Sequence, residues 1–122
     1  MQDNLGEVEQ ERRKFVRLDI SCNVNYKILD EKPIIQDKSQ TKNISAGGIC
    51  LIVDEELKPG TSLDLDFELP DKKTPIKAKG MVVWIKPFKI ASEQQHFDSG
   101  IEFTQISPTE RKRIDQYVFR FK

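Results

Sequence analysis

A basic segment near the start of the sequence carries the side chains best suited to binding an anion. Residues 12–17, which we call the arm, contain Arg12, Arg13, Lys14 and Arg17. A guanidinium group stays charged, offers its donors in a planar fork, and suits phosphate oxygens or the face of a nucleobase. In an extended chain Arg13 and Arg17 share a face, with Cα atoms about 13 Å apart. The pattern predicts an anion clamp; the alternative is a solvated basic segment that precedes a strand.

A second polar motif occupies residues 43–48, with the sequence NISAGG. This composition is typical of a turn, in which Asn and Ser bond their own backbone and glycine relieves strain. The same groups can also recognise a ligand. The Asn43 amide and the Ser45 hydroxyl suit the polar edge of a base, and glycine at position 48 lets a ligand approach the main chain. Both interpretations remain open from the motif alone.

The apolar pattern predicts the elements that hold these two motifs. Apolar residues that recur at every second position predict half-buried strands. Trp84 is in phase with Val82, so its side chain is expected in the core. A short apolar run predicts a strand buried on both sides, and one polar stretch is expected to be an edge or exposed strand. The expected half-buried strands cover 18–28, 63–69, 76–84 and 97–103, the buried strand covers 49–53, and the polar strand covers 34–42.

The end of the chain changes to a helical period. Ser107 and Glu110 form a capping box, with proline at the first helical position, and an apolar stripe follows. We therefore expect a C-terminal helix over 107–121. Because no helix separates the strands, parallel βαβ architecture is excluded. The sequence predicts an all-β fold with one helix, in the form of a small antiparallel barrel.

Composition narrows the classes of function. The 122 residues suffice for one domain, which we assign to 12–122 after a flexible lead at 1–11. Twenty basic and twenty acidic residues balance, which argues against binding nucleic acid through bulk charge. One histidine, two scattered cysteines and no nucleophile-elbow, P-loop or dinucleotide motif argue against an enzyme or a metal site. An acidic start and no long apolar stretch predict a cytoplasmic protein without a membrane span.

The two motifs together resemble the PilZ domain, a bacterial receptor module for cyclic di-GMP. Its pattern is RxxxR, here Arg13 to Arg17, followed by [DN]xSxxG, here Asn43, Ser45 and Gly48. The resemblance covers residues 11–121 and implies a six-stranded antiparallel barrel with a C-terminal helix. It also implies site roles: the two arginines bind phosphate and guanine, Asn43 and Ser45 contact the guanine edge with its neighbouring phosphate or ribose, and Gly48 keeps the surface open. Arg12, just before the motif, adds another guanidinium.

The resemblance implies a non-enzymatic function, in which cyclic di-GMP binds and a conformational change passes the signal to a partner protein. No cofactor is expected beyond this ligand, and the partner's identity stays open. One alternative is a PilZ-like protein-interaction module with weak or no nucleotide binding. Another is a barrel that binds single-stranded nucleic acid. The zero net charge disfavours it, as does the position of most aromatic residues on the faces expected to be buried. The process served, the ligand affinity and stoichiometry, and the choice between monomer and homodimer are not determined by the sequence.

Overall fold

The computed structural model describes residues 15–30, 32, 35–71, 74–89 and 95–122. The lead at 1–11 and the first half of the arm, with Arg12 and Arg13, lie outside the described residues. The strands are β1 (Asn23–Ile28), β2 (Ile35–Ser45), β3 (Gly48–Val53), β4 (Ser62–Phe67), β5 (Ile76–Lys89) and β6 (Gln95–Ile106), and the helix is α2 (Pro108–Phe121).

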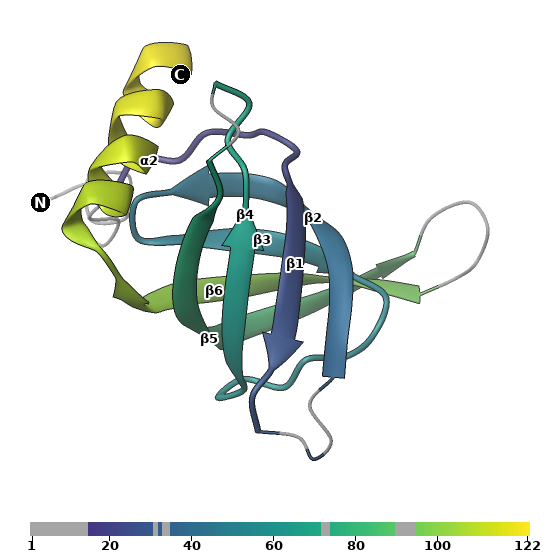
Figure 1. The fold of residues 1–122 in the computed structure, drawn as a ribbon. Helices are drawn as coiled ribbons and strands as arrows, with labels where there is room; N and C mark the ends of the chain where they lie inside the picture. Colours follow the sequence, from purple (N-terminus) through teal and green to yellow (C-terminus); the bar gives the residue numbers. More distant parts are fainter. Residues whose placement is uncertain (1–14, 31, 33–34, 72–73, 90–94) are drawn as a thin grey trace, which may run out of the picture.

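The six strands close into one antiparallel barrel. Their order around it is β1-β2-β3-β6-β5-β4, and each strand pairs with both neighbours in that ring. In Figure 1, β1, β4 and the first parts of β2 and β5 form the near wall, β3 and much of β6 lie behind, and α2 covers one side. The predicted fold class is confirmed.

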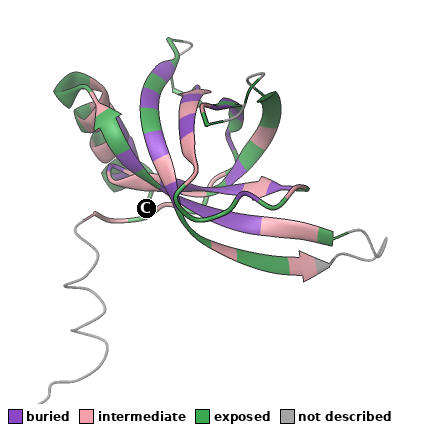
Figure 2. Ribbon diagram, turned by 90° about the horizontal axis from the view of Figure 1, so that it is seen from below, coloured by how far each residue is buried: buried purple, intermediate pink, exposed green. Residues whose placement is uncertain are grey.

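Alternating burial explains why these residues form strands. Val24, Tyr26 and Ile28 of β1 point into the core, while the polar residues between them face outward. β4 follows the same pattern, and in Figure 2 bands of buried (purple) and exposed or intermediate residues alternate along strands of the barrel. Each such side chain contributes about 1.5–3 kcal/mol when it leaves water, so the barrel interior fixes which face of each strand is outside.

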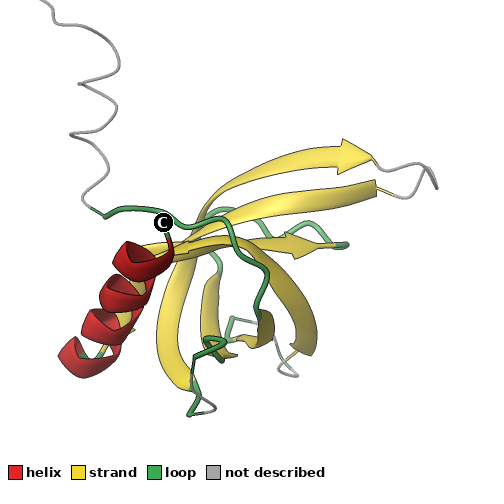
Figure 3. Ribbon diagram, turned by 90° about the horizontal axis from the view of Figure 1, so that it is seen from above, coloured by secondary structure: helices red, strands yellow, loops and turns green. Residues whose placement is uncertain are grey.

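Several boundaries differ from the sequence prediction. Regular pairing begins at Asn23. In the described segment before it, Leu18 forms an isolated bridge to Ile44, and the Cys22 carbonyl accepts from the Thr41 N–H at 2.9 Å. β2 continues to Ser45, so the predicted turn at 43–48 is shortened to Ala46 and Gly47. β5 and β6 are longer than expected and form a hairpin that extends past the barrel in Figure 3. Tertiary pairing extended these strands into sequence that has weak strand periodicity.

The helix begins where its capping signal predicts. The Ser107 hydroxyl accepts from the backbone N–H of Glu110 at 3.1 Å and donates to the Glu110 carboxylate at 3.2 Å. Ile114, Tyr117 and Val118 are buried against the barrel. No helix among the described residues is long and apolar enough to cross a membrane.

Helix docking should contribute strongly to stability. Ile114 is fully buried, so Ile114→Ala should lower the free energy of unfolding by about 2–5 kcal/mol. Lys112→Ala, on the exposed face of the same helix, is the matched control and should change it by less than about 0.5 kcal/mol. Urea denaturation followed by circular dichroism measures both. Equal stability of the two variants would mean that α2 does not support the barrel.

Candidate nucleotide-binding site

A backbone bridge brings the arm to the second motif. The Leu18 N–H donates to the Ile44 carbonyl and the Ile44 N–H donates to the Leu18 carbonyl, each at 2.9 Å. Ile44 points into the core. Since neighbouring residues in extended chains alternate in direction, Arg17 and Ser45 lie on the outer face, next to each other across the bridge.

Four predicted site residues meet in one pocket. Arg17, Asn43, Ser45 and Gly48 line a depression of about 160 Å³. This volume is below the roughly 300–1,000 Å³ of ordinary small-molecule sites, so the described residues form only part of a site for a dinucleotide. The remaining lining residues come from the turn and from β3, β5 and β6: Gly47, Ile49, Cys50, Val83, Trp84, Gly100, Ile101 and Glu102.

Ser45 holds the turn together. Its hydroxyl accepts from the Gly47 N–H at 3.2 Å and donates to the Gly48 carbonyl at 3.3 Å. The turn interpretation of this residue is thus confirmed, and a ligand contact would use the remaining lone pair of the hydroxyl. Asn43, by contrast, is half-buried in the pocket wall, and its amide makes no hydrogen bond among the described residues.

Gly48 is required for a reason that the motif did not reveal. A Cβ atom at this position would lie 3.1 Å from the backbone carbon of Ile101 and clash with its carbonyl oxygen. Gly48 pairs with Glu102, and the close approach of β3 and β6 leaves no space for a side chain. The expected role, an open surface for the ligand, is therefore accompanied by a packing role inside the barrel wall.

Charges around the pocket are locally organised. Lys42 donates to the Asp98 carboxylate at 2.7 Å, and this hydrogen bond raises the pKa of the lysine. Arg17 and Glu102 are both exposed and line the pocket. The site can therefore offer a cation to a phosphate and a carboxylate to a hydrogen-bond donor.

The Cys50 thiol forms an uncharged part of the wall. Cys50 is buried although it lies on the outward side of β3, away from the core cluster. Burial, reinforced by the Asp98 carboxylate, raises the pKa of the thiol to about 11. The thiol is therefore protonated at neutral pH.

The prediction for Trp84 is wrong. A β-bulge between Val82 and Trp84 shifts the pairing of β5 with β6, so the alternation that placed Trp84 in the core is broken. The indole is 41% exposed and lies over Gly100, where a Cβ atom would be 2.7 Å from its Cδ1 atom. Trp84 is thus a pocket residue that sequence reasoning missed, because a bulge leaves no clear mark in the hydrophobic pattern.

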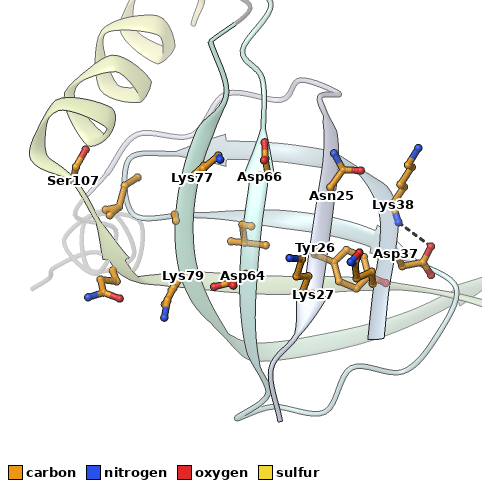
Figure 4. A pocket seen from close by; sticks show the side chains of 15 residues that line it. Asn25, Tyr26, Lys27, Asp37, Lys38, Asp64, Asp66, Lys77, Lys79 and Ser107 are labelled. Carbon is orange, nitrogen blue, oxygen red and sulfur yellow. Dashed lines mark hydrogen bonds between the residues drawn. The ribbon is translucent and has the colours of Figure 1, made fainter. Parts of the chain in front are cut away.

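A larger groove of about 950 Å³ lies elsewhere, along β1, β2, β4, β5 and the end of β6. Figure 4 shows its charged side chains from neighbouring strands in rows. Asp64 stands between Lys27 and Lys79 in the pairing register, and Asp66 stands opposite Lys77. Because positive and negative groups alternate there, the groove offers no concentrated charge for an anion, and it contains none of the predicted site residues.

Comparison with known proteins gives a consistent result. The family model described as PilZ domain matches residues 11–120. No curated protein matches the chain. Among solved structures, the Bacillus subtilis inhibitor of motility, MotI/DgrA, has a TM-score of 0.71 at 25% identity, covering 89% of this chain and 50% of that one.

Two further structures are complexes with cyclic di-GMP. The PilZ domain of YcgR from Escherichia coli has a TM-score of 0.70 at 15% identity, covering 90% of this chain and 91% of that one. The MrkH complex from K. pneumonia has a TM-score of 0.70 at 16% identity, covering 88% of this chain and 51% of that one. At these identities both show a shared fold alone. The chain spans about half the length of the MotI and MrkH structures.

The buried thiol gives a direct test of the pocket wall. Cys50 and Cys22 are each less than 5% exposed, and burial raises the pKa of both. At pH 8 the native protein should therefore react with a disulfide reagent on the order of 100-fold more slowly than a Lys112→Cys variant reacts at its added thiol. Reaction in guanidinium chloride, where unfolding exposes both native thiols, gives the total number of thiols that can react. Rapid labelling of Cys50 in the folded protein would mean that this wall is open.

Proposed function

The chain belongs to the PilZ domain family, and on that premise we propose that it is a receptor for the bacterial second messenger cyclic di-GMP. The observation that carries the proposal is the convergence of Arg17 from the first motif with Asn43, Ser45 and Gly48 from the second in one pocket. Cyclic di-GMP complexes of YcgR and MrkH, which share this fold, support it. We extend the proposal to a cytoplasmic location, since the ligand is an intracellular signal.

Each motif residue has a role suited to its chemistry. The Arg17 guanidinium bonds a phosphate or stacks on guanine, because it is exposed at the pocket edge. The Asn43 amide, which makes no hydrogen bond to the part of the chain that the structure describes, can both donate to and accept from the guanine edge. Arg12 and Arg13, which precede the described residues, are assigned to the phosphates and to guanine from the other end of the arm.

The small volume of the pocket implies how binding generates a signal. A pocket of about 160 Å³ cannot enclose a cyclic dinucleotide, so the arm has to supply further contacts. Restraining long arginine side chains on a ligand costs conformational entropy, which the charge-assisted hydrogen bonds must exceed. The output is then a changed protein surface, with no reaction of the ligand, and a partner protein of unknown identity recognises that surface.

Arg17 should dominate the affinity contributed by the described part of the pocket. Arg17→Ala should weaken cyclic di-GMP binding by about 10- to 150-fold, or roughly 1.5–3 kcal/mol, because a charge-assisted contact is lost. Arg13→Ala should have a similar effect. Arg120→Ala, an exposed arginine at the end of α2, removes the same charge away from the pocket and should leave the affinity unchanged.

Isothermal titration calorimetry measures these affinities, with GTP as a control ligand. Because part of the interaction is ionic, the wild-type affinity should also fall as salt rises. If both arm variants bind as tightly as the wild type, the clamp is not formed by these arginines. If the folded wild type gives no heat with cyclic di-GMP, the receptor proposal fails and the protein-interaction module becomes the better explanation.

Trp84 provides an internal probe of the same site. It is the single tryptophan of the chain, it is partly exposed, and it lines the pocket. Its fluorescence should therefore change saturably with cyclic di-GMP, with a midpoint equal to the calorimetric dissociation constant. Arg17→Ala should shift that midpoint by the factor seen in calorimetry. Binding by calorimetry without any change in Trp84 emission would place the ligand away from this wall.

A further inference from the structure

Phe15 lies in the arm between the two motif arginines, and its ring occupies a defined place. A Cβ atom at Gly47 would be 2.9 Å from Cε2 of Phe15, and nearer still to its Cδ2 atom. Real side chains do not approach so closely, so the ring fills the space that any side chain at position 47 would need. Gly47 has no left-handed φ, so the contact with Phe15, and not backbone conformation, explains the glycine.

The first turns of α2 supply a second contact to the same ring. The Cζ atom of Arg111 lies 5.2 Å from the centroid of Phe15, which is a cation–π distance. The ring also packs against the hydrophobic core at its edge. In Figure 1 the described start of the chain (purple) emerges beside α2. Phe15 therefore touches both the turn of the second motif and the C-terminal helix.

These contacts fix the chain on both sides of Arg17. Leu18 is held by its two backbone hydrogen bonds to Ile44, and Phe15 is held at Gly47. Only Val16 and Arg17 lie between the two fixed points. The direction in which Arg17 leaves the backbone is thus set before any ligand arrives, and an arm held in this way loses less freedom on binding.

We propose that Phe15 is the positioning residue of the arm. Its ring, which packs on Gly47 beneath Arg111, directs the Arg17 side chain towards the pocket and links occupation of the pocket to helix α2. This inference rests on the proposed function, since it assigns the arm to cyclic di-GMP. The inference goes beyond the proposed function in two ways. It assigns a role to a residue that is not one of the motif arginines, and it identifies a physical route from the pocket to the helix.

The binding test uses the full chain and two substitutions that break the contact from opposite sides. Phe15→Ala should weaken cyclic di-GMP binding roughly 5- to 50-fold, since an aromatic contact and the preorganisation of Arg17 are lost. Gly47→Ala should have a similar effect, because its methyl group displaces the ring. The double variant should be no weaker than Phe15→Ala alone, because the smaller side chain leaves room for the methyl group.

Two further variants separate the contacts of the ring from unrelated effects. Arg111→Gln, which removes the cation over the ring, should weaken binding about 2- to 5-fold. Phe119→Ala is the matched control, because Phe119 is an exposed phenylalanine of the same helix, and it should bind as the wild type does. Normal affinity in both Phe15→Ala and Gly47→Ala, or simple additivity in the double variant, would overturn the proposal.

Hydrogen exchange tests the anchor without relying on the ligand. In the free protein, Phe15→Ala should speed exchange at the Leu18 amide and leave the β4 and β5 amides unchanged. With cyclic di-GMP, amides in the first turns of α2 should gain protection in the wild type and not in Phe15→Ala. Unchanged Leu18 exchange would overturn the anchor, and absent protection of α2 would overturn the link to the helix. A wild type that does not bind defeats the proposed function, while the Leu18 measurement still decides the anchor.

Discussion

The site depends on one pair of backbone hydrogen bonds, between Leu18 and Ile44. An arginine side chain is long and cannot hold itself in place, so its position comes from the main chain. Ile44 is fully buried, and Leu18 packs at the edge of the core. The hydrophobic interior therefore fixes the bridge, and the bridge fixes the cation beside Ser45. Each of these hydrogen bonds contributes only about 0.5–1.5 kcal/mol to the net stability. Together they nevertheless hold two motifs that are distant in the sequence next to each other.

The proposed binding of an anion rests on local geometry and not on the total charge of the chain. The chain has no net charge, and the lysines of the large groove alternate with aspartates in the strand register. Beside the pocket, Lys42 is engaged by Asp98. Arg17 faces a pocket that also contains Glu102 and the neutral Cys50 thiol. Such a site suits a ligand with a phosphate at one end and hydrogen-bond donors at the other, as a guanine nucleotide has.

Sequence periodicity was sufficient for the barrel because the alternation in segments such as Val24 to Ile28 records burial directly. The capping signal at Ser107 likewise predicted the start of α2. The sequence does not predict the register in which β5 and β3 pair with β6. The bulge that turns Trp84 outward depends on pairing with β6, and the approach of Ile101 to Gly48 depends on β3 and β6 meeting. The motif residues on the turn were therefore predictable, whereas the wall opposite them was not. The binding roles of the predicted site residues remain predictions: Arg12, Arg13, Arg17, Asn43, Ser45 and Gly48.

Two adjacent glycines, Gly47 in the turn and Gly48 at the start of β3, explain why the arm, the barrel and the helix can be so close. The lack of a side chain at Gly48 leaves room for the backbone of Ile101, and the lack of one at Gly47 leaves room for the ring of Phe15. β6 and the arm can therefore both approach these two residues closely. The ring in turn lies beneath Arg111 of α2. If ligand binding and the helix are coupled through this contact, thermodynamic linkage makes the coupling reciprocal. A partner that favours the ligand-bound arrangement of α2 must then tighten cyclic di-GMP binding by the same factor by which the ligand tightens the partner's binding.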